Sequence, residues 1–196
     1  GTLAVLEAWA GHTDNAQELT AEWRATRTYR ERWAQAPYPP ILVTVDIVVE
    51  CAGRVLIVER GGRPGKGCLA LPGGFLDEHE SLFAAALREL EEETGVPSEL
   101  TEALGGGEEW LSYDFPEELR KQLWRGSYVG QQQKWFGFKF LGQDSDVNIA
   151  TEHAEFGAWQ WVELEDTVEL IVPFKRDLYQ QIVDQFLPIR DRLRQS

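Results

Sequence analysis

The order of apolar and polar positions predicts a chain of strands interrupted by amphipathic helices. Residues 43–50 alternate between apolar and polar as a half-buried strand does, and residues 54–60 repeat this pattern after the short Ala52-Gly53 turn. Two such segments joined by so short a turn predict a β-hairpin. Further strands are predicted at residues 109–113, 134–141 and 158–162.

Helical spacing occurs at both ends of the chain. Residues 14–36 carry an apolar stripe that ends at Pro37, and residues 173–187 begin with a proline in the first turn, as many helices do. The stripe of the second segment consists of Leu178, Ile182 and Phe186. Because strands and helices alternate, we expect an α/β sandwich preceded by an N-terminal helical arm. An apolar stripe of this kind usually packs or dimerises, so a homodimer through the arm is one possibility.

Length and charge narrow the range of functions. The chain has 196 residues, enough for one well-buried domain, and a formal net charge of -14. Such a charge disfavours broad, nonspecific nucleic-acid binding, which depends on neutralising many phosphates. It is compatible with a nucleotide or a single RNA end held through metal ions.

Cysteine usage and hydropathy indicate a soluble cytoplasmic protein. Cys51 and Cys68 form no disulfide framework and lack metal-ligand spacing, so both are expected to be buried or half-buried thiols. The first residues do not resemble a signal peptide, and no apolar run reaches transmembrane length.

A third helical segment, after residue 81, is strongly acidic on one side. Glu89, Glu92 and Glu93 are three and four positions apart and therefore share a face. Carboxylates grouped in this way suit hard divalent cations such as Mg²⁺ or Mn²⁺. Another side of the same helix is apolar and should pack on a core: Leu82, Phe83, Ala86, Leu87 and Leu90.

Most acidic helix faces are only solvated surface, so the surrounding residues decide the interpretation. Arg88 follows Glu80 by two helical turns and can pair with it, which would hold the preceding loop against the helix. Gly73, Gly74 and Gly95 allow tight turns and close backbone approach. A merely solvated face does not account for these residues at fixed offsets.

Residues 74–96 resemble the Nudix box, G-x5-E-x7-R-E-U-x-E-E-x-G-U, in which U is a bulky aliphatic residue. The positions that match are Gly74, Glu80, Arg88, Glu89, Leu90, Glu92, Glu93, Gly95 and Val96. The resemblance implies a mixed sheet between helices (α/β/α) and hydrolysis of a nucleoside diphosphate linked to another group. It assigns supporting structural roles to Gly74, Glu80, Arg88 and Gly95.

The same resemblance assigns the site chemistry. Glu89, Glu92 and Glu93 would be ligands of Mg²⁺ or Mn²⁺, with the backbone carbonyl of Gly73 as an additional ligand. Glu92, Glu93 and Glu155 would be the catalytic carboxylates, and Glu155 is the candidate for activating water. A bound divalent ion would neutralise the pyrophosphate and lower the pKa of the attacking water.

Residues 109–187 resemble a narrower group, the RNA pyrophosphohydrolases and their relatives that cleave diadenosine polyphosphates. The matching segments are Trp110-Leu-Ser-Tyr-Asp-Phe-Pro, Gly130-Gln-Gln-Gln-Lys-Trp-Phe, Glu155-Phe with Trp159-Gln-Trp-Val, and Val172-Pro-Phe-Lys-Arg followed by Tyr179. This resemblance implies that Lys134 and Lys175 hold phosphates, that Arg176 supports them, and that Phe174 stacks on a base. The alternative, exposed lysines and a core phenylalanine, stays open. Trp110 and Trp135 are further candidates for base stacking.

The earlier part of the chain resembles a different group. Trp33, Ala36-Pro-Tyr-Pro-Pro, Val43-Thr-Val-Asp, Arg63-Pro-Gly-Lys-Gly and Leu71-Pro-Gly-Gly-Phe-Leu are similar to the Nudix domain of bifunctional nicotinamide-mononucleotide (NMN) adenylyltransferase/ADP-ribose pyrophosphatases. RNA pyrophosphohydrolases usually carry other residues where this chain has Leu69, Pro72-Gly73 and Pro39. A natural intermediate lineage and an engineered chimera joined between Val96 and Glu108 both explain this division.

Three functions follow from these resemblances. We prefer a pyrophosphohydrolase acting on diadenosine polyphosphates or 5′-triphosphorylated RNA ends, and the alternative enzyme is an ADP-ribose pyrophosphatase. A nucleotide-sensing binding protein is the alternative of another class. The expected organisation is a helical arm at residues 1–36, a Nudix hydrolase domain at residues 37–188 and a C-terminal tail at residues 189–196.

Overall fold

The computed structural model describes most of the chain after residue 41. The described residues are 42–61, 66–77, 79–107, 109–122, 128–151 and 154–195. They belong to one compact unit, Ile41–Ser196. The predicted helical arm at residues 1–36, and the dimer contact predicted through it, lie outside the described residues.

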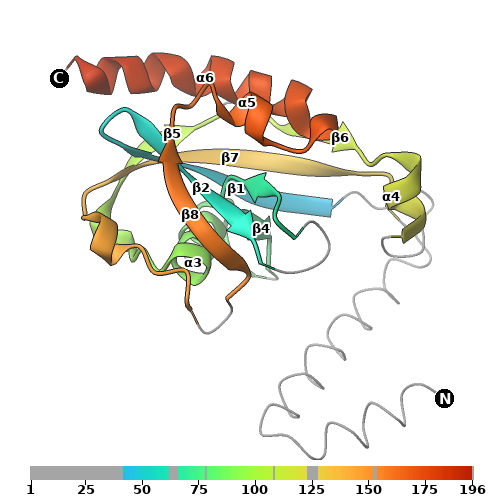
Figure 1. The fold of residues 1–196 in the computed structure, drawn as a ribbon, viewed down its shortest axis with the longest axis horizontal. Coiled ribbons are helices and arrows are strands. Elements are labelled where there is room, and N and C mark those ends of the chain that lie inside the picture. The colour runs from blue at the N-terminus through green and yellow to red at the C-terminus, as the bar shows by residue number, and fades with distance from the viewer. Residues whose placement is uncertain are drawn as a thin grey trace, which may run out of the picture. The chain divides into compact units, whose positions relative to one another are not determined.

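An eight-stranded mixed sheet organises the described residues (Figure 1). Its strands are β1 (Leu42–Cys51), β2 (Arg54–Arg60), β3 (Leu69–Ala70), β4 (Gly73–Phe75), β5 (Thr101–Gly106), β6 (Leu111–Asp114), β7 (Gly130–Phe140) and β8 (Phe156–Val162). The order is β3-β2-β1-β7-β5, with β4 paired to β1, β6 to β7 and β8 to β2. The β1–β7 pair is parallel and the other pairs are antiparallel.

The predicted β1–β2 hairpin is confirmed, and its strands separate soon after the turn. Ala52 and Gly53 have positive φ angles of 50° and 84°, which tight hairpin turns require. Beyond the turn, β3 pairs with β2 while β4 pairs with β1, so the two short strands fill the space between them. The Ile47 N–H donates to the Pro72 carbonyl at 2.9 Å. This arrangement sets Gly73, just before the box, beside the middle of β1.

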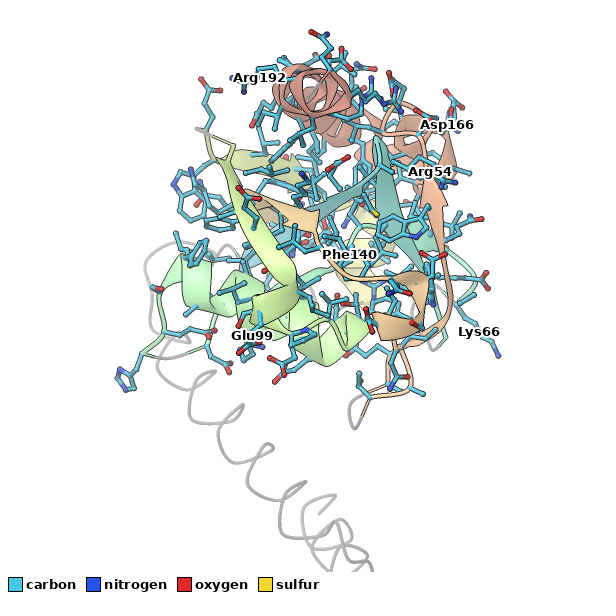
Figure 2. The ribbon with its side chains drawn as sticks, turned by 90° about the vertical axis from the view of Figure 1, so that its left-hand side faces the viewer. Arg54, Lys66, Glu99, Phe140, Asp166 and Arg192 are labelled. Atoms are coloured by element: carbon cyan, nitrogen blue, oxygen red, sulfur yellow. The ribbon has the colours of Figure 1, made fainter. Side chains whose placement is uncertain are left out.

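Helices cover both faces of the sheet. They are α3 (Leu82–Thr94), α4 (Glu117–Gln122), α5 (Thr167–Leu170) and α6 (Arg176–Arg194), with 3-10 turns η1 (Ser98–Leu100), η3 (Asp144–Asp146) and η4 (Pro173–Lys175). Figure 1 shows α3 on one face and α6 on the other. In Figure 2, Arg192 of α6 and Glu99 beyond α3 lie on opposite sides of Phe140 in the sheet. The predicted α/β/α arrangement is therefore confirmed.

Alternation along β1 divides the core between these helices. The odd positions pack with α3 in one cluster, which includes Val45, Ile47, Val49, Ala85, Ala86, Leu90 and Phe138. The even position Val48 packs with α6 in a second cluster, which also includes Trp135, Leu178, Tyr179, Ile182 and Phe186. Three other even positions of β1 are polar and also buried: Thr44, Asp46 and Glu50. Three buried polar side chains therefore face the α6 side from one strand.

Defined caps explain where α3 begins and ends. The Ser81 hydroxyl accepts a hydrogen bond from the Ala84 N–H at 3.1 Å, as N-cap serines do. Gly95 ends the helix with a φ of 68°, and its N–H donates to the Glu91 carbonyl at 2.8 Å. A side chain on Gly95 would also collide with the Asn148 backbone, since a Cβ would lie 2.6 Å from that carbonyl oxygen.

The C-terminal helix is longer than its sequence pattern predicts. α6 continues through Pro188 to Arg194, so most of the segment predicted to be a C-terminal tail is helical. Arg190 forms an ion pair with Glu165 and Arg194 donates to the Gly53 carbonyl at 2.6 Å, and these contacts hold the last turns to the domain. No helix among the described residues is long and apolar enough to cross a membrane.

Two further differences concern the glycine-rich segment and β7. β5 extends into the glycine-rich segment after α3 and pairs there with β7, with a shift of register between Ala103 and Gly105. β7 begins at Gly130, four residues before the predicted strand, because its polar glutamines pair with β1 and β6. Cys51 and Cys68 are free and half-buried, as predicted.

Candidate active site

Arg88 fixes the loop of the box against its helix. Its Nη2 donates to Glu80 Oε1 at 2.8 Å and to the Phe75 carbonyl at 2.9 Å, and its Nε donates to Glu80 Oε2 at 3.2 Å. Glu80 also accepts the Asp77 N–H at 2.7 Å. The hydrogen bonds from Arg88 are the main reason that the pKa of Glu80 is lowered. The predicted Glu80–Arg88 pair is therefore present, and it closes the loop before α3.

Glu89 and Glu93 lie against the glycines that precede the box helix. Glu93 Oε2 accepts the Gly73 N–H at 2.7 Å, which joins α3 to β4. The Glu89 carboxylate occupies the space where Gly74 would carry a side chain, because a Cβ there would be less than 3.0 Å from both of its oxygens. Both carboxylates are buried. Gly74 therefore makes room for a carboxylate.

The electrostatics of these two carboxylates reflect burial and mutual repulsion. Burial raises the pKa of Glu89 to about 7, with the Arg88 hydrogen bonds opposing and the charges of Glu92 and Glu155 adding to the rise. Burial also raises the pKa of Glu93 well above its ordinary value, with the Gly73 N–H opposing. A nearby cation would relieve both effects, because it stabilises the ionised form of each group.

Glu155 lies close enough to the box helix to affect it electrostatically. It is exposed in the segment before β8, and its backbone carbonyl accepts the Gly61 N–H at 2.8 Å. Its charge contributes to the raised pKa values of both Glu89 and Glu93. The structure thus brings Glu155 near the carboxylates of α3 across a long sequence separation.

The box carboxylates suit a hard divalent cation, although in this structure they bond to protein groups. Among the described residues, no three His, Cys, Asp or Glu side chains converge closely enough to hold a metal ion. Arg88 Nη1 holds both Glu89 and Glu92 at 2.9 Å, and Glu93 is bonded to Gly73. A bound ion would compete with Arg88 for Glu89 and Glu92. Carboxylate and carbonyl oxygens are ligands that Mg²⁺ and Mn²⁺ accept.

Asp46 is a buried carboxylate on the α6 side of the sheet that sequence reasoning did not single out. It lies in the middle of β1, directly opposite Gly73 of β4, and is 8% exposed. Burial raises its pKa to about 6, while the charges of Lys175 and Arg60 and a hydrogen bond from Thr44 oppose the rise. The available signal was an acidic residue at an inward position of an alternating strand.

A line of side-chain hydrogen bonds leads to Asp46 from the neighbouring strands. The Tyr113 hydroxyl on β6 donates to Gln131 Oε1 on β7. Gln131 Nε2 donates to Thr44 Oγ1 at 2.9 Å, and Thr44 Oγ1 donates to Asp46 Oδ2 at 2.7 Å. These four side chains link β6, β7 and β1 on one face of the sheet.

Two of the predicted substrate contacts lie beside this line. The Lys175 ammonium is 4.8 Å from the centre of the Tyr113 ring, and burial lowers its pKa while Asp46 opposes that shift. Phe174 is 39% exposed, and its ring centre is 5.9 Å from that of Tyr113. Arg176 instead pairs with Glu169 at 3.2 Å. Phe174 and Lys175 are thus brought together with Asp46, and Arg176 is engaged elsewhere.

The remaining candidates for substrate contact are Lys134 and Trp135 on β7 and Trp110 just before β6. Lys134 Nζ donates to the Gly107 carbonyl at 2.8 Å and lies 5.8 Å from the centre of the Trp110 ring. Trp110 is 43% exposed and is available for stacking. Trp135 is only 1% exposed and packs edge-on against Tyr179, so the prediction that it stacks on a base is wrong.

Comparison with known proteins identifies the family. The sequence profile of the NUDIX domain matches residues 40–182, most of the chain. The RNA pyrophosphohydrolase of Roseobacter denitrificans is 46% identical over 156 residues, which cover 80% of this chain and 96% of that protein. Both the family profile and this relative extend well beyond the box itself.

Solved structures show the same fold. A bifunctional NMN adenylyltransferase/ADP-ribose pyrophosphatase from Francisella tularensis, complexed with AMP and a Mn ion, is 27% identical with a TM-score of 0.55. The match covers 91% of this chain and 50% of that one, so this chain spans about half of the bifunctional protein. A C. elegans Ap4A hydrolase has a TM-score of 0.54 at 22% identity and covers 76% of this chain and 98% of that one. The fold, the complete box and these matches together show that the chain belongs to the Nudix family.

Proposed function

We propose that this chain is a divalent-metal-dependent pyrophosphohydrolase that acts on 5′-triphosphorylated RNA ends. The observation that carries the proposal is the match to an RNA pyrophosphohydrolase at 46% identity over 156 residues. In a chain of 196 residues, a match of this length must include both the box and the residues after it, wherever it begins. Both parts therefore support one substrate class.

The box residues would perform the chemistry. Glu89, Glu92 and Glu93, with the Gly73 carbonyl, would hold Mg²⁺ or Mn²⁺, which supplies charge neutralisation at the pyrophosphate and lowers the pKa of a bound water. Glu155 would accept the proton of the attacking water, since its charge already acts on Glu89 and Glu93.

The substrate contacts follow from the groups around Tyr113. Lys175 is half-buried beside that ring and would hold a phosphate oxygen, and Lys134 would hold another from β7. Phe174 exposes a ring on which a base can stack. The charge of Arg60 acts on both Glu93 and Asp46, so the substrate would extend past Arg60 from the carboxylates of α3 toward the start of α6.

ADP-ribose is the second candidate substrate. The structure of the F. tularensis bifunctional protein, whose name includes ADP-ribose pyrophosphatase, is 27% identical over 91% of this chain. Diadenosine polyphosphates share the linked phosphates and aromatic bases, and they form a third candidate. A purely nucleotide-sensing role is disfavoured by the complete set of box carboxylates. We further propose a cytoplasmic location, which is compatible with an RNA substrate, and a homodimer through residues 1–36.

The deciding experiment compares three substrates under identical conditions. Mg²⁺-dependent hydrolysis of a 5′-triphosphorylated RNA, diadenosine tetraphosphate and ADP-ribose would be followed by chromatography of the products. Glu93→Gln is the inactive control, and Glu99→Gln at an exposed position beyond α3 is its matched control. The highest kcat/KM is expected for the RNA. A higher value for ADP-ribose, or no turnover of any substrate, would overturn the proposal.

A further inference from the structure

We propose that Asp46 determines base specificity by accepting a hydrogen bond from an amino or imino N–H of a substrate nucleobase. This inference rests on the proposed function, because it assumes a nucleotide substrate. It concerns a residue outside the box, in the Val43-Thr-Val-Asp segment, to which the sequence analysis assigned no role. The argument depends on the hydrogen bonding of the carboxylate, on its surroundings and on the rings nearby.

Asp46 has one committed oxygen and one free oxygen. Within the described part of the chain, the Thr44 hydroxyl is the single donor to this side chain, and it bonds Oδ2. Among the described residues no donor bonds Oδ1, and Asp46 as a whole is 8% exposed. A carboxylate can accept about four hydrogen bonds. Oδ1 is therefore open to a ligand that supplies a hydrogen.

The line of hydrogen bonds fixes which oxygen is free. Gln131 offers its amide N–H to Thr44 Oγ1, so the Thr44 hydroxyl proton must point to its other partner, Asp46. The Tyr113 hydroxyl fixes the orientation of the Gln131 amide by donating to its oxygen. The relay consequently leaves Oδ1 as the open oxygen, and in the ionised carboxylate Oδ1 can only accept.

Nucleobase chemistry fits this position better than phosphate chemistry. A phosphate is an anion without donors at neutral pH, and it would be repelled by a carboxylate. Lys175, whose charge acts on Asp46, is the group that would take a phosphate oxygen. The Tyr113 and Phe174 rings lie on the same side and can contact a flat base.

Two neighbouring side chains of β7 add further unpaired polar atoms. Gln133 and Trp135 pair with Thr44 and Asp46 in the β1–β7 register. Each is 1% exposed, and Gln133 Oε1 and Trp135 Nε1 have no partner among the described residues. Buried polar groups are rarely left unpaired, so the sheet around Asp46 is unusually polar for a core.

The experiment measures kcat/KM for 5′-triphosphorylated RNAs in which one terminal base is changed. Guanine and adenine carry N–H donors on their pairing edges, and unsubstituted purine carries none there. The wild-type protein should prefer one donor-bearing base over purine by about tenfold or more, at the first or second nucleotide. The ratio of kcat/KM for two bases, measured on the same protein sample, does not depend on the fraction of the protein that is folded.

Asp46→Asn gives the sharpest test, because the relay dictates how the amide must lie. The Thr44 proton requires the amide oxygen, so the NH2 group takes the place of Oδ1 and turns an acceptor into a donor. The preference for the donor-bearing base should fall by tenfold or invert, and Asp46→Ala should abolish it. Glu50→Gln, at a buried carboxylate on the same strand and face, should keep the wild-type ranking.

Other outcomes would overturn the inference. An unchanged ranking of bases in Asp46→Asn would show that Asp46 does not take part in base recognition. Equal use of all bases, with a loss on 2′-deoxy substitution that Asp46→Asn abolishes, would assign the contact to ribose. If no RNA is hydrolysed, the proposed function fails on its own. The same base series in dinucleoside tetraphosphates or ADP-ribose analogues then tests Asp46 separately.

Discussion

Replacing Gly74 by alanine should separate activity from stability. The added Cβ would lie less than 3.0 Å from both oxygens of the Glu89 carboxylate. The carboxylate is the far end of a flexible side chain, so it can yield by roughly 1 Å to reach ordinary contact distance. A displacement of that size in a catalytic group can cost about 100-fold in rate. We therefore expect kcat/KM to fall by about 100-fold in Gly74→Ala.

Gly73→Ala is the matched control, with the opposite expectation for stability. Its Cβ would meet backbone atoms, the Val45 carbonyl oxygen at 2.5 Å and the Asp46 Cα at 2.6 Å, and its φ of 149° strains any other residue. Backbone in the centre of a sheet cannot yield as a side chain does. Overpacking and strain of this kind cost about 2–4 kcal/mol, or roughly 4–16 °C in Tm for a chain of this size.

Both variants would be followed by thermal unfolding and by steady-state kinetics on the preferred substrate. Gly74→Ala should melt within about 3 °C of the wild-type protein, a shift that corresponds to roughly 1 kcal/mol. Wild-type kcat/KM in Gly74→Ala would refute the reasoning that Glu89 must occupy the space beside this glycine. A loss of stability equal to that of Gly73→Ala would show that the carboxylate cannot move.

Three further perturbations test the site. Glu93→Gln keeps an acceptor for the Gly73 N–H but removes a ligand charge, so turnover should fall at least 100-fold with Tm nearly unchanged; comparable turnover would exclude Glu93 as a ligand. Arg88→Lys loses the paired hydrogen bonds to Glu80 and should lower the free energy of unfolding in urea by about 1–3 kcal/mol. An unchanged urea concentration at the midpoint of unfolding would contradict this. In metal-free protein, the pKa of Glu89 is about 7 in the folded state and 4.5 ordinarily, so the folded state binds this proton more tightly than the unfolded state does. Stability should therefore decline between about pH 4.5 and 7, by up to roughly 3 kcal/mol, and Glu89→Gln should flatten this decline in unfolding free energy.

The parts of the site that follow helical spacing could be predicted from the sequence. Glu80 and Arg88 pair, Gly95 caps the helix, and the apolar side of α3 packs on β1. The apolar side follows directly from helical periodicity. Glu80 lies two residues before α3 and reaches Arg88 because the loop folds back against the helix. Even so, the spacing did not reveal that Arg88 also holds Glu89 and Glu92, because rotamers decide which partner a guanidinium takes.

The α6 side of the site depends on strand register, which the sequence does not encode locally. Asp46, Gln131 and Tyr113 belong to three strands, and they meet because β1 pairs with β7 and β7 with β6. Trp135 was misjudged for the same reason, since its register with Asp46 turns it under α6. Trp110, just outside β6, stays exposed.

The parallel pairing of β1 with β7 also determines when the domain can fold during its synthesis. Leu42 pairs with Gln131 and Glu50 with Lys139, so the centre of the sheet joins segments that leave the ribosome far apart in time. At about 5–20 residues per second, the finished box helix waits a few seconds for β7 to emerge. During this interval α3 has the strands made before it, β1 to β4, but not β7, and pairing over such a sequence separation is slow. A nascent chain that carries every box carboxylate therefore still lacks Trp135, Phe138 and all of α6, and the β1 residues that they cover stay exposed until those segments are made.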